Sequence, residues 1–147
     1  MTRPLAIVLV AVAGLLVGMQ PPINARLGRE IGGLQAAAFS FIAGTVALVL
    51  IVAVSKRGIG TLGDVGRVPW WALLGGLLGA VYVTVAILTV RTLGVSSLTA
   101  IVIAGQLAGA VVIDRFGLLG IAKQPIGAGR IIGLVLLVIG VVLVVRR

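Results

Sequence analysis

The sequence predicts an all-α integral membrane protein, a bundle of about five transmembrane helices. Of its 147 residues, 61% are hydrophobic and only 10% are charged, whereas a soluble domain is usually about one quarter charged. The apolar residues form long runs without charges, and the segments between these runs are short. Charged side chains this sparse cannot cover a water-facing surface, so we expect the chain to lie in a lipid bilayer.

Five stretches are long enough to cross a bilayer. A helix needs about 20 apolar residues to cross the ~30 Å hydrocarbon core. Because no water is present there, the backbone must bond within each segment, which predicts helices. The fifth stretch qualifies if Arg130 extends to the interface. We expect one multi-pass domain over residues 1–147, with these spans: Pro4–Ala25, Gly33–Val54, Val68–Val90, Thr92–Ile113 and Ile126–Val145.

The composition also excludes several kinds of chemistry. The chain has no Cys and no His, so we expect no disulfide, thiol nucleophile or imidazole base. The net charge is +9, but the basic residues separate apolar runs and form no basic face suited to nucleic acid. They are typical of anchors at the lipid headgroups. We therefore expect no enzyme, no cofactor, no metal and no nucleic-acid partner.

Each span contains two small residues four positions apart. Such pairs let helix backbones approach closely, which is how helices commonly associate in lipid. Five pairs favour a packed bundle, although Gly is also common in membrane helices for other reasons. The pairs expected at helix contacts are Gly14/Gly18, Ser40/Gly44, Gly75/Gly79, Gly105/Gly109 and Gly129/Gly133.

The basic residues are divided almost evenly between the two sides of the predicted bundle. Seven lie on the side of the N-terminus and five on the other side. The positive-inside rule favours an N-terminus in the cytoplasm, but by a small margin. This balance would let the chain insert in both orientations and pair as an antiparallel homodimer. The alternative is one orientation, decided by the two longer connections, Ser55–Arg67 and Asp114–Arg130.

The strongest site signal is the segment Gln20-Pro21-Pro22-Ile23-Asn24 in the first span. Gln20 and Asn24 lie four residues apart, so they share a helix face. The two prolines remove helix hydrogen bonds and leave carbonyls free. Free backbone groups at this depth are tolerated where they face protein or a wet cavity. The segment is equally interpretable as part of a binding site or as a structural kink near the membrane surface. In a transporter, Pro21 and Pro22 would provide the hinge of this span.

Neutral polar side chains in three further spans are candidates for the same site. Ser40 lies in the second span, where a hydroxyl commonly bonds its own backbone. Tyr82, the only tyrosine, lies near the middle of the third span and needs a partner for its hydroxyl. Gln106 in the fourth span could line a site or bond a neighbouring helix. Arg91 and Asp114 are interpreted first as interfacial charges.

The depths of these residues favour an antiparallel pair. Gln20, Ser40 and Tyr82 fall in one half of the bilayer, and Gln106 falls in the other half. In an antiparallel dimer, Gln106 of one copy would lie level with the other three residues of the second copy. Two related polar layers would then surround a central cavity.

Several ordered motifs along nearly the whole chain resemble the YdcZ-type family of small bacterial membrane proteins, within the drug/metabolite transporter superfamily. In chain order they are Gly18-Met19-Gln20, Asn24-Ala25-Arg26-Leu27-Gly28, Ser40-Phe41, Gly44-Thr45, Gly75-Gly76-Leu77-Leu78-Gly79-Ala80, Tyr82, Leu93-Gly94, Ala104-Gly105-Gln106, Asp114-Arg115-Phe116-Gly117 and the closing Gly133…Gly140.

The resemblance implies a five-helix half-transporter in a bacterial inner membrane, found as dual-topology chains, opposite-topology pairs or fused tandems. The superfamily contains exporters that work by alternating access. Its small multidrug exporters carry a glutamate in the first helix, and the first span here has none. Proton-coupled export of cations is therefore not implied.

Together these observations predict a transporter of a small polar solute that works as an antiparallel homodimer. We expect Gln20, Asn24, Ser40, Tyr82 and Gln106 to bind the solute. A passive channel would use the same cavity without counterflow or saturation. A non-transporting subunit would pack against a larger partner and tolerate apolar replacement of these residues.

Overall fold

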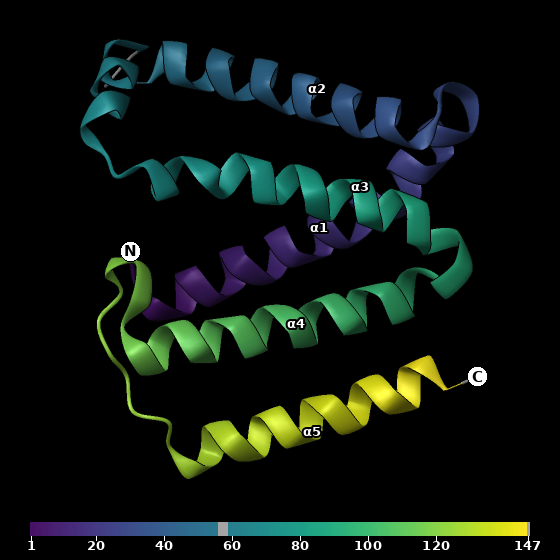
Figure 1. The fold of residues 1–147 in the computed structure, drawn as a ribbon, viewed down its shortest axis with the longest axis vertical. Helices are drawn as coiled ribbons and strands as arrows, with labels where there is room; N and C mark the ends of the chain where they lie inside the picture. The colour runs from purple at the N-terminus through teal and green to yellow at the C-terminus, as the bar shows by residue number, and fades with distance from the viewer. Residues whose placement is uncertain (56–58, 147) are drawn as a thin grey trace. The chain divides into compact units, whose positions relative to one another are not determined.

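The computed structural model describes residues 1–55 and 59–146, and every regular element in them is helical. Lys56, Arg57 and Arg147, which contribute to the charge balance, lie outside the described residues. The described residues form five long helices and three shorter 3-10 segments (Figure 1). The elements are α1 (Arg3–Ile31), α2 (Gly33–Val54), η1 (Ile59–Arg67), η2 (Trp70–Leu74), α3 (Gly75–Leu93), α4 (Val95–Phe116), η3 (Leu118–Gly120) and α5 (Ala128–Val145).

All five long helices are apolar and long enough to cross a membrane, counting η2 with α3 as Trp70–Leu93. The ends of these helices differ from the expected spans at some charged or glycine-containing segments. Helix α1 continues past the apolar run to Ile31, and an exposed Arg26–Glu30 ion pair four residues apart lies on its last turns. Residues Ile59–Arg67 form a 3-10 helix, where the sequence predicts only a loop.

Pro21 and Pro22 lie inside α1, which remains one helix through both of them. Each proline lacks the amide hydrogen that would bond four residues back. Pro21 is buried and Pro22 is exposed. The helix therefore carries a locally weakened hydrogen-bond ladder without a break.

The chain divides into two compact units, Met1–Arg91 and Thr92–Arg147. In the first unit α1 and α2 meet at Gly32, whose φ of 95° is readily adopted only by glycine. From this turn the two helices separate toward their other ends (Figure 1). The buried core of the unit, Ala36, Ala37 and Ile87, lies beside the turn, with Leu27 and Val83 packed against it.

Two glycines beside this turn allow the closest approach in the first unit. A Cβ on Gly28 would lie 3.5 Å from Ile87 Cγ2, and one on Gly33 would lie 3.0 Å from Leu88 Cδ2. Among the glycines expected at helix contacts, Gly79 would meet the ring of Phe41 at 3.4 Å. The others would meet no atom within 4 Å, so their role in helix packing remains a prediction: Gly14, Gly18, Gly44, Gly75, Gly105 and Gly109.

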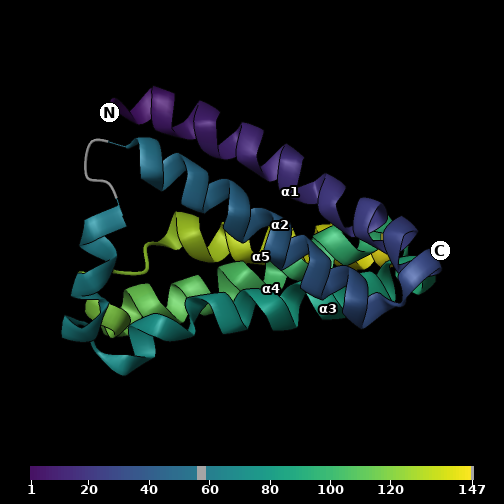
Figure 2. The ribbon, with the colours of Figure 1, turned by 90° about the horizontal axis from the view of Figure 1, so that it is seen from above.

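The second unit is an antiparallel hairpin in which α4 and α5 lie side by side (Figure 2). An ion pair between Asp114 and Arg130 joins the last turn of α4 to the first turn of α5. The side chains of this pair are 18% and 35% exposed. At the other end of the hairpin, Ser97 Oγ donates to the Val144 carbonyl at 3.5 Å. The hairpin is therefore connected near both ends.

The charges of the Asp114–Arg130 pair oppose the dipoles of their own helices. A carboxylate is unfavourable at a helix C-terminus, and a guanidinium is unfavourable at a helix N-terminus. We expect either Asp114→Arg or Arg130→Asp alone to lower the free energy of unfolding by about 1–3 kcal/mol. The double exchange should restore it to at least the wild-type value, because both charges then match the dipoles. Denaturation of the purified protein in detergent measures this. A double variant as unstable as the single variants would exclude a structural role for the pair.

Candidate functional site

Polar residues of α1 and α3 border a narrow recess within the first unit. Gln20, Pro21 and Asn24 line it from α1. Tyr82 lines it from α3, together with the apolar side chains of Val83, Ala86 and Ile87. The recess contains about 160 Å³ of empty space, but it is too narrow to admit a water-sized sphere. In this conformation the candidate residues are packed against each other rather than around a wet cavity.

A hydrogen bond between α1 and α2 lies next to this recess. Asn24 Nδ2 donates to Ser40 Oγ over 3.2 Å. Asn24 is only 8% exposed, and Ser40 is half-buried. An amide without a partner costs several kcal/mol in hydrocarbon, so this bond offsets part of the cost of burying Asn24. It also means that Ser40 accepts a hydrogen bond from another helix.

Two other polar groups beside the recess are free to accept a partner. Gln20 is exposed and Tyr82 is half-buried. Among the described residues, neither the Gln20 amide nor the Tyr82 hydroxyl makes a hydrogen bond. By contrast, Thr84 Oγ1 on the same helix donates to its own Ala80 carbonyl. The structure therefore brings together Gln20, Asn24, Ser40 and Tyr82, two of them bonded to each other and two with unused polar groups.

Gln106 belongs to the second unit and is exposed on α4. Within that unit, its amide makes no hydrogen bond among the described residues. Asp114, interpreted from sequence as an interfacial charge, forms an ion pair with Arg130. The backbone N–H of Gln124 also donates to the backbone carbonyl of Asp114 at 2.9 Å. Asp114 therefore stabilises the connection before α5.

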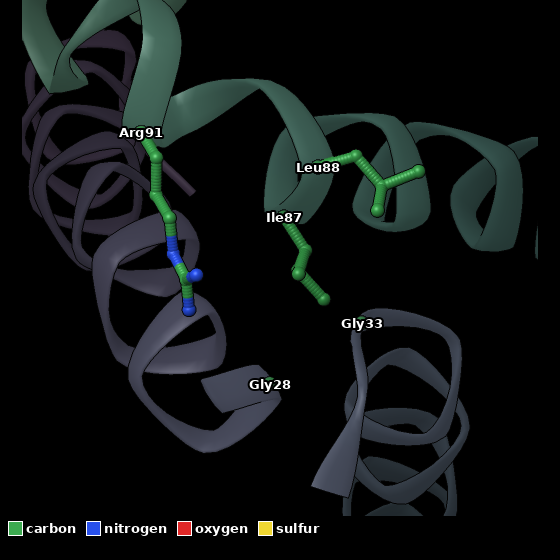
Figure 3. A pocket seen from close by; sticks show the side chains of 5 residues that line it. All are labelled: Gly28, Gly33, Ile87, Leu88 and Arg91. Atoms are coloured by element: carbon green, nitrogen blue, oxygen red, sulfur yellow. The ribbon is translucent and has the colours of Figure 1, made fainter. Parts of the chain in front are cut away.

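Sequence reasoning missed a second feature of the first unit. Arg91 Nη2 donates to the carbonyl of Ala25 at 2.7 Å. The same arginine lines a cavity together with Gly28, Gly33, Ile87 and Leu88 (Figure 3). The available signal in the sequence is Gly28, which lies between the first two apolar runs, and Gly33, which begins the second run. Neither belongs to the five pairs of small residues expected at helix contacts.

The recess offers amides, a hydroxyl and a phenol, which can bind a solute by hydrogen bonds. In the described part of the chain, no group of three or more His, Cys, Asp or Glu could hold a metal ion. Five membrane-length helices with a polar recess in one unit are typical of a multi-pass transport protein.

Comparisons with known proteins identify the family. Residues 5–143 match the family described as "Putative inner membrane exporter, YdcZ". The chain is also 30% identical over 150 residues to the "Inner membrane protein YdcZ" of Escherichia coli (strain K12), and the match covers 100% of this chain and 99% of that protein. No solved structure matches the chain significantly.

The chain belongs to the YdcZ family. It is a multi-pass protein of the bacterial inner membrane, and its long helices contact the lipid bilayer. Membership supports membrane transport as its general function. It is also consistent with a protein that is not an enzyme.

Proposed function

We propose that this protein exports a small polar solute by alternating access, as an antiparallel homodimer of dual-topology chains. The observation that carries the proposal is the polar cluster of the first unit. Asn24 and Ser40 bond to each other across two helices, while Gln20 and Tyr82 have unused polar groups at the same recess. Neutral amides and hydroxyls suit a neutral or weakly charged solute.

In this proposal each chain is a five-helix half-transporter of the drug/metabolite type and forms one multi-pass domain. The substrate-binding residues are Gln20, Asn24, Ser40 and Tyr82 of one copy and Gln106 of the other. Pro21 and Pro22 provide the hinge of α1, because the hydrogen-bond ladder is weakest there. The recess is too narrow for water in the present conformation, so alternating access requires it to open.

In this proposal, the small residues of the spans, which the sequence predicts at helix contacts, also serve the contacts between copies. Most of the glycines predicted at helix contacts have open space where a Cβ would lie. Helices associate in lipid through such surfaces. The nearly even division of basic residues between the two sides supports the dual topology that an antiparallel pair requires.

Two rival functions make different predictions. A passive channel would use the same polar groups but would show neither counterflow nor saturation of transport. A subunit without transport activity would purify with a larger partner, and its polar cluster would tolerate apolar replacement.

Export is testable by replacing Gln20 and Gln106, whose side chains are exposed in the structure, with alanine. We expect Escherichia coli cells that lack their own YdcZ and express this protein to release one or a few small polar solutes. Gln20→Ala and Gln106→Ala should each reduce that release by about tenfold, the effect of losing about 1.4 kcal/mol of binding. Mass spectrometry of the medium measures it, at matched protein levels in the membrane.

Thr89→Ala is the matched control for export, because the Thr89 hydroxyl donates to the Val85 carbonyl of its own helix. This variant should release solutes like the wild type. If Gln20→Ala and Gln106→Ala also release solutes like the wild type, the proposed binding residues are wrong.

Dual topology is testable with single cysteines, because the chain has none. Reporters at Thr2 and Gly60 lie on one predicted side, and a reporter at Arg146 lies on the other. In whole cells, a membrane-impermeant maleimide should label about half of each reporter, since dual topology inserts both orientations in similar amounts. Permeabilised cells give the total.

One orientation would instead protect the reporters at Thr2 and Gly60 completely and label the reporter at Arg146 fully. That result would exclude the antiparallel homodimer. A partner chain of opposite topology would then be required for the pairing.

A further inference from the structure

A second cavity lies in the first unit, where the ends of α1 and α3 meet the start of α2. It has a volume of about 120 Å³, well above the ~10–15 Å³ that a single water molecule requires. Gly28 and Gly33 line it from α1 and α2, and Ile87, Leu88 and Arg91 line it from α3 (Figure 3). Unlike the recess beside Asn24, this cavity has room for a bound group.

Glycines of α1 and α2 form one wall of the cavity, and side chains of α3 form the other. Gly28 and Gly33 have no side chains to fill the space between the helices. Arg91 lies four residues after Ile87 and three after Leu88 on α3, so its side chain neighbours both of them along the helix. The two aliphatic side chains form an apolar wall, and the guanidinium lies one turn further along it (Figure 3).

Among the residues that the structure describes, only Arg91 brings a charge to the lining of this cavity. Among the described residues it forms no ion pair with a carboxylate. Glu30, the acidic residue at the same end of α1, is paired with Arg26. Arg29 adds a further positive charge on the last turn of α1. The local charge therefore repels cations and attracts anions.

The guanidinium is also held in place. Its Nη2 donates to the Ala25 carbonyl, which uses one of the five N–H donors of the side chain. The remaining donors can bind an oxyanion, and a planar guanidinium matches a carboxylate or phosphate with two parallel hydrogen bonds.

We propose that this cavity binds one anionic group, a carboxylate or a phosphate, through Arg91. The same chemistry is offered by the phosphate of an anionic lipid headgroup and by a dissolved anion, and the test below distinguishes them. The proposal goes beyond the export function, since it concerns a different cavity and none of the residues proposed to bind the solute.

The first arm of the test addresses the lipid. The purified full-length protein is analysed by native mass spectrometry from micelles containing phosphatidylglycerol and phosphatidylcholine. The second arm addresses dissolved anions. The protein in nanodiscs of phosphatidylcholine alone is titrated with inorganic phosphate or acetate, and binding is measured from the rise in its unfolding temperature.

The wild type should retain phosphatidylglycerol over phosphatidylcholine, or should be stabilised by phosphate or acetate, or both. Retention of the lipid alone identifies a headgroup as the ligand, and stabilisation by dissolved anions identifies a solute. In either arm, Arg91→Gln should weaken binding by about tenfold, because it removes the charge. Arg91→Lys should retain part of the binding, since it keeps a charge but loses the planar fork.

Arg29→Gln is the matched control, because it removes one positive charge at the same end of α1 from a residue that does not line the cavity. It should bind anions like the wild type. Equal loss in Arg29→Gln and Arg91→Gln would overturn the site in favour of general attraction. Unchanged binding in Arg91→Gln, or no preference for anions in either arm, would also overturn it. If Arg91→Gln fails to fold, Arg91→Lys decides by the same comparison.

Discussion

The water-free core of the bilayer is the constraint on which this structure depends, because every buried polar group there must find its partner within the protein. Most of the chain meets this requirement with backbone hydrogen bonds inside five long apolar helices. Asn24 cannot do so, since its amide is almost fully buried in α1. It bonds Ser40 of α2 instead. That bond links the first two helices at the place where Gln20 and Tyr82 border the same recess, so structural stability and the proposed solute recognition involve the same cluster.

Glycine and charge determine the remaining contacts of each unit. In the first unit, Gly28 and Gly33 allow α3 to pack against the α1–α2 turn, and Arg91 fastens α3 to the Ala25 carbonyl. In the second unit, Asp114 and Arg130 pair although each charge opposes its own helix dipole. The packed end of the first unit therefore lies at the turn, while the spans of α1 and α2 separate beyond it (Figure 1). An arrangement of this kind leaves helix surfaces for lipid and, in the proposed dimer, for a second copy.

Hydropathy predicts the five helices because the bilayer sets both their length and their apolar composition. It does not predict their ends, since a helix such as α1 continues through charged residues that a surface ion pair stabilises. The grouping of Gln20 with Asn24 follows from helical spacing, whereas the partnership of Asn24 with Ser40 depends on the turn at Gly32. The cavity lined by Gly28, Gly33 and Arg91 does not follow from the sequence, because these residues lie outside the apolar runs or at their boundary and come together only when α3 packs there.

Alternating access requires the polar cluster around Asn24 and Ser40 to open to water during transport. The reactivity of a cysteine at residue 40 measures this opening. Ser40→Cys changes one atom, and Ile42→Cys is a control at similar depth on the opposite, exposed face of α2. A charged, membrane-impermeant methanethiosulfonate reacts only with a thiol that water can reach. We expect a cysteine at position 40 to react from both sides of the membrane and a cysteine at position 42 to remain unreacted. Equal lack of reaction at both positions would contradict the proposed opening.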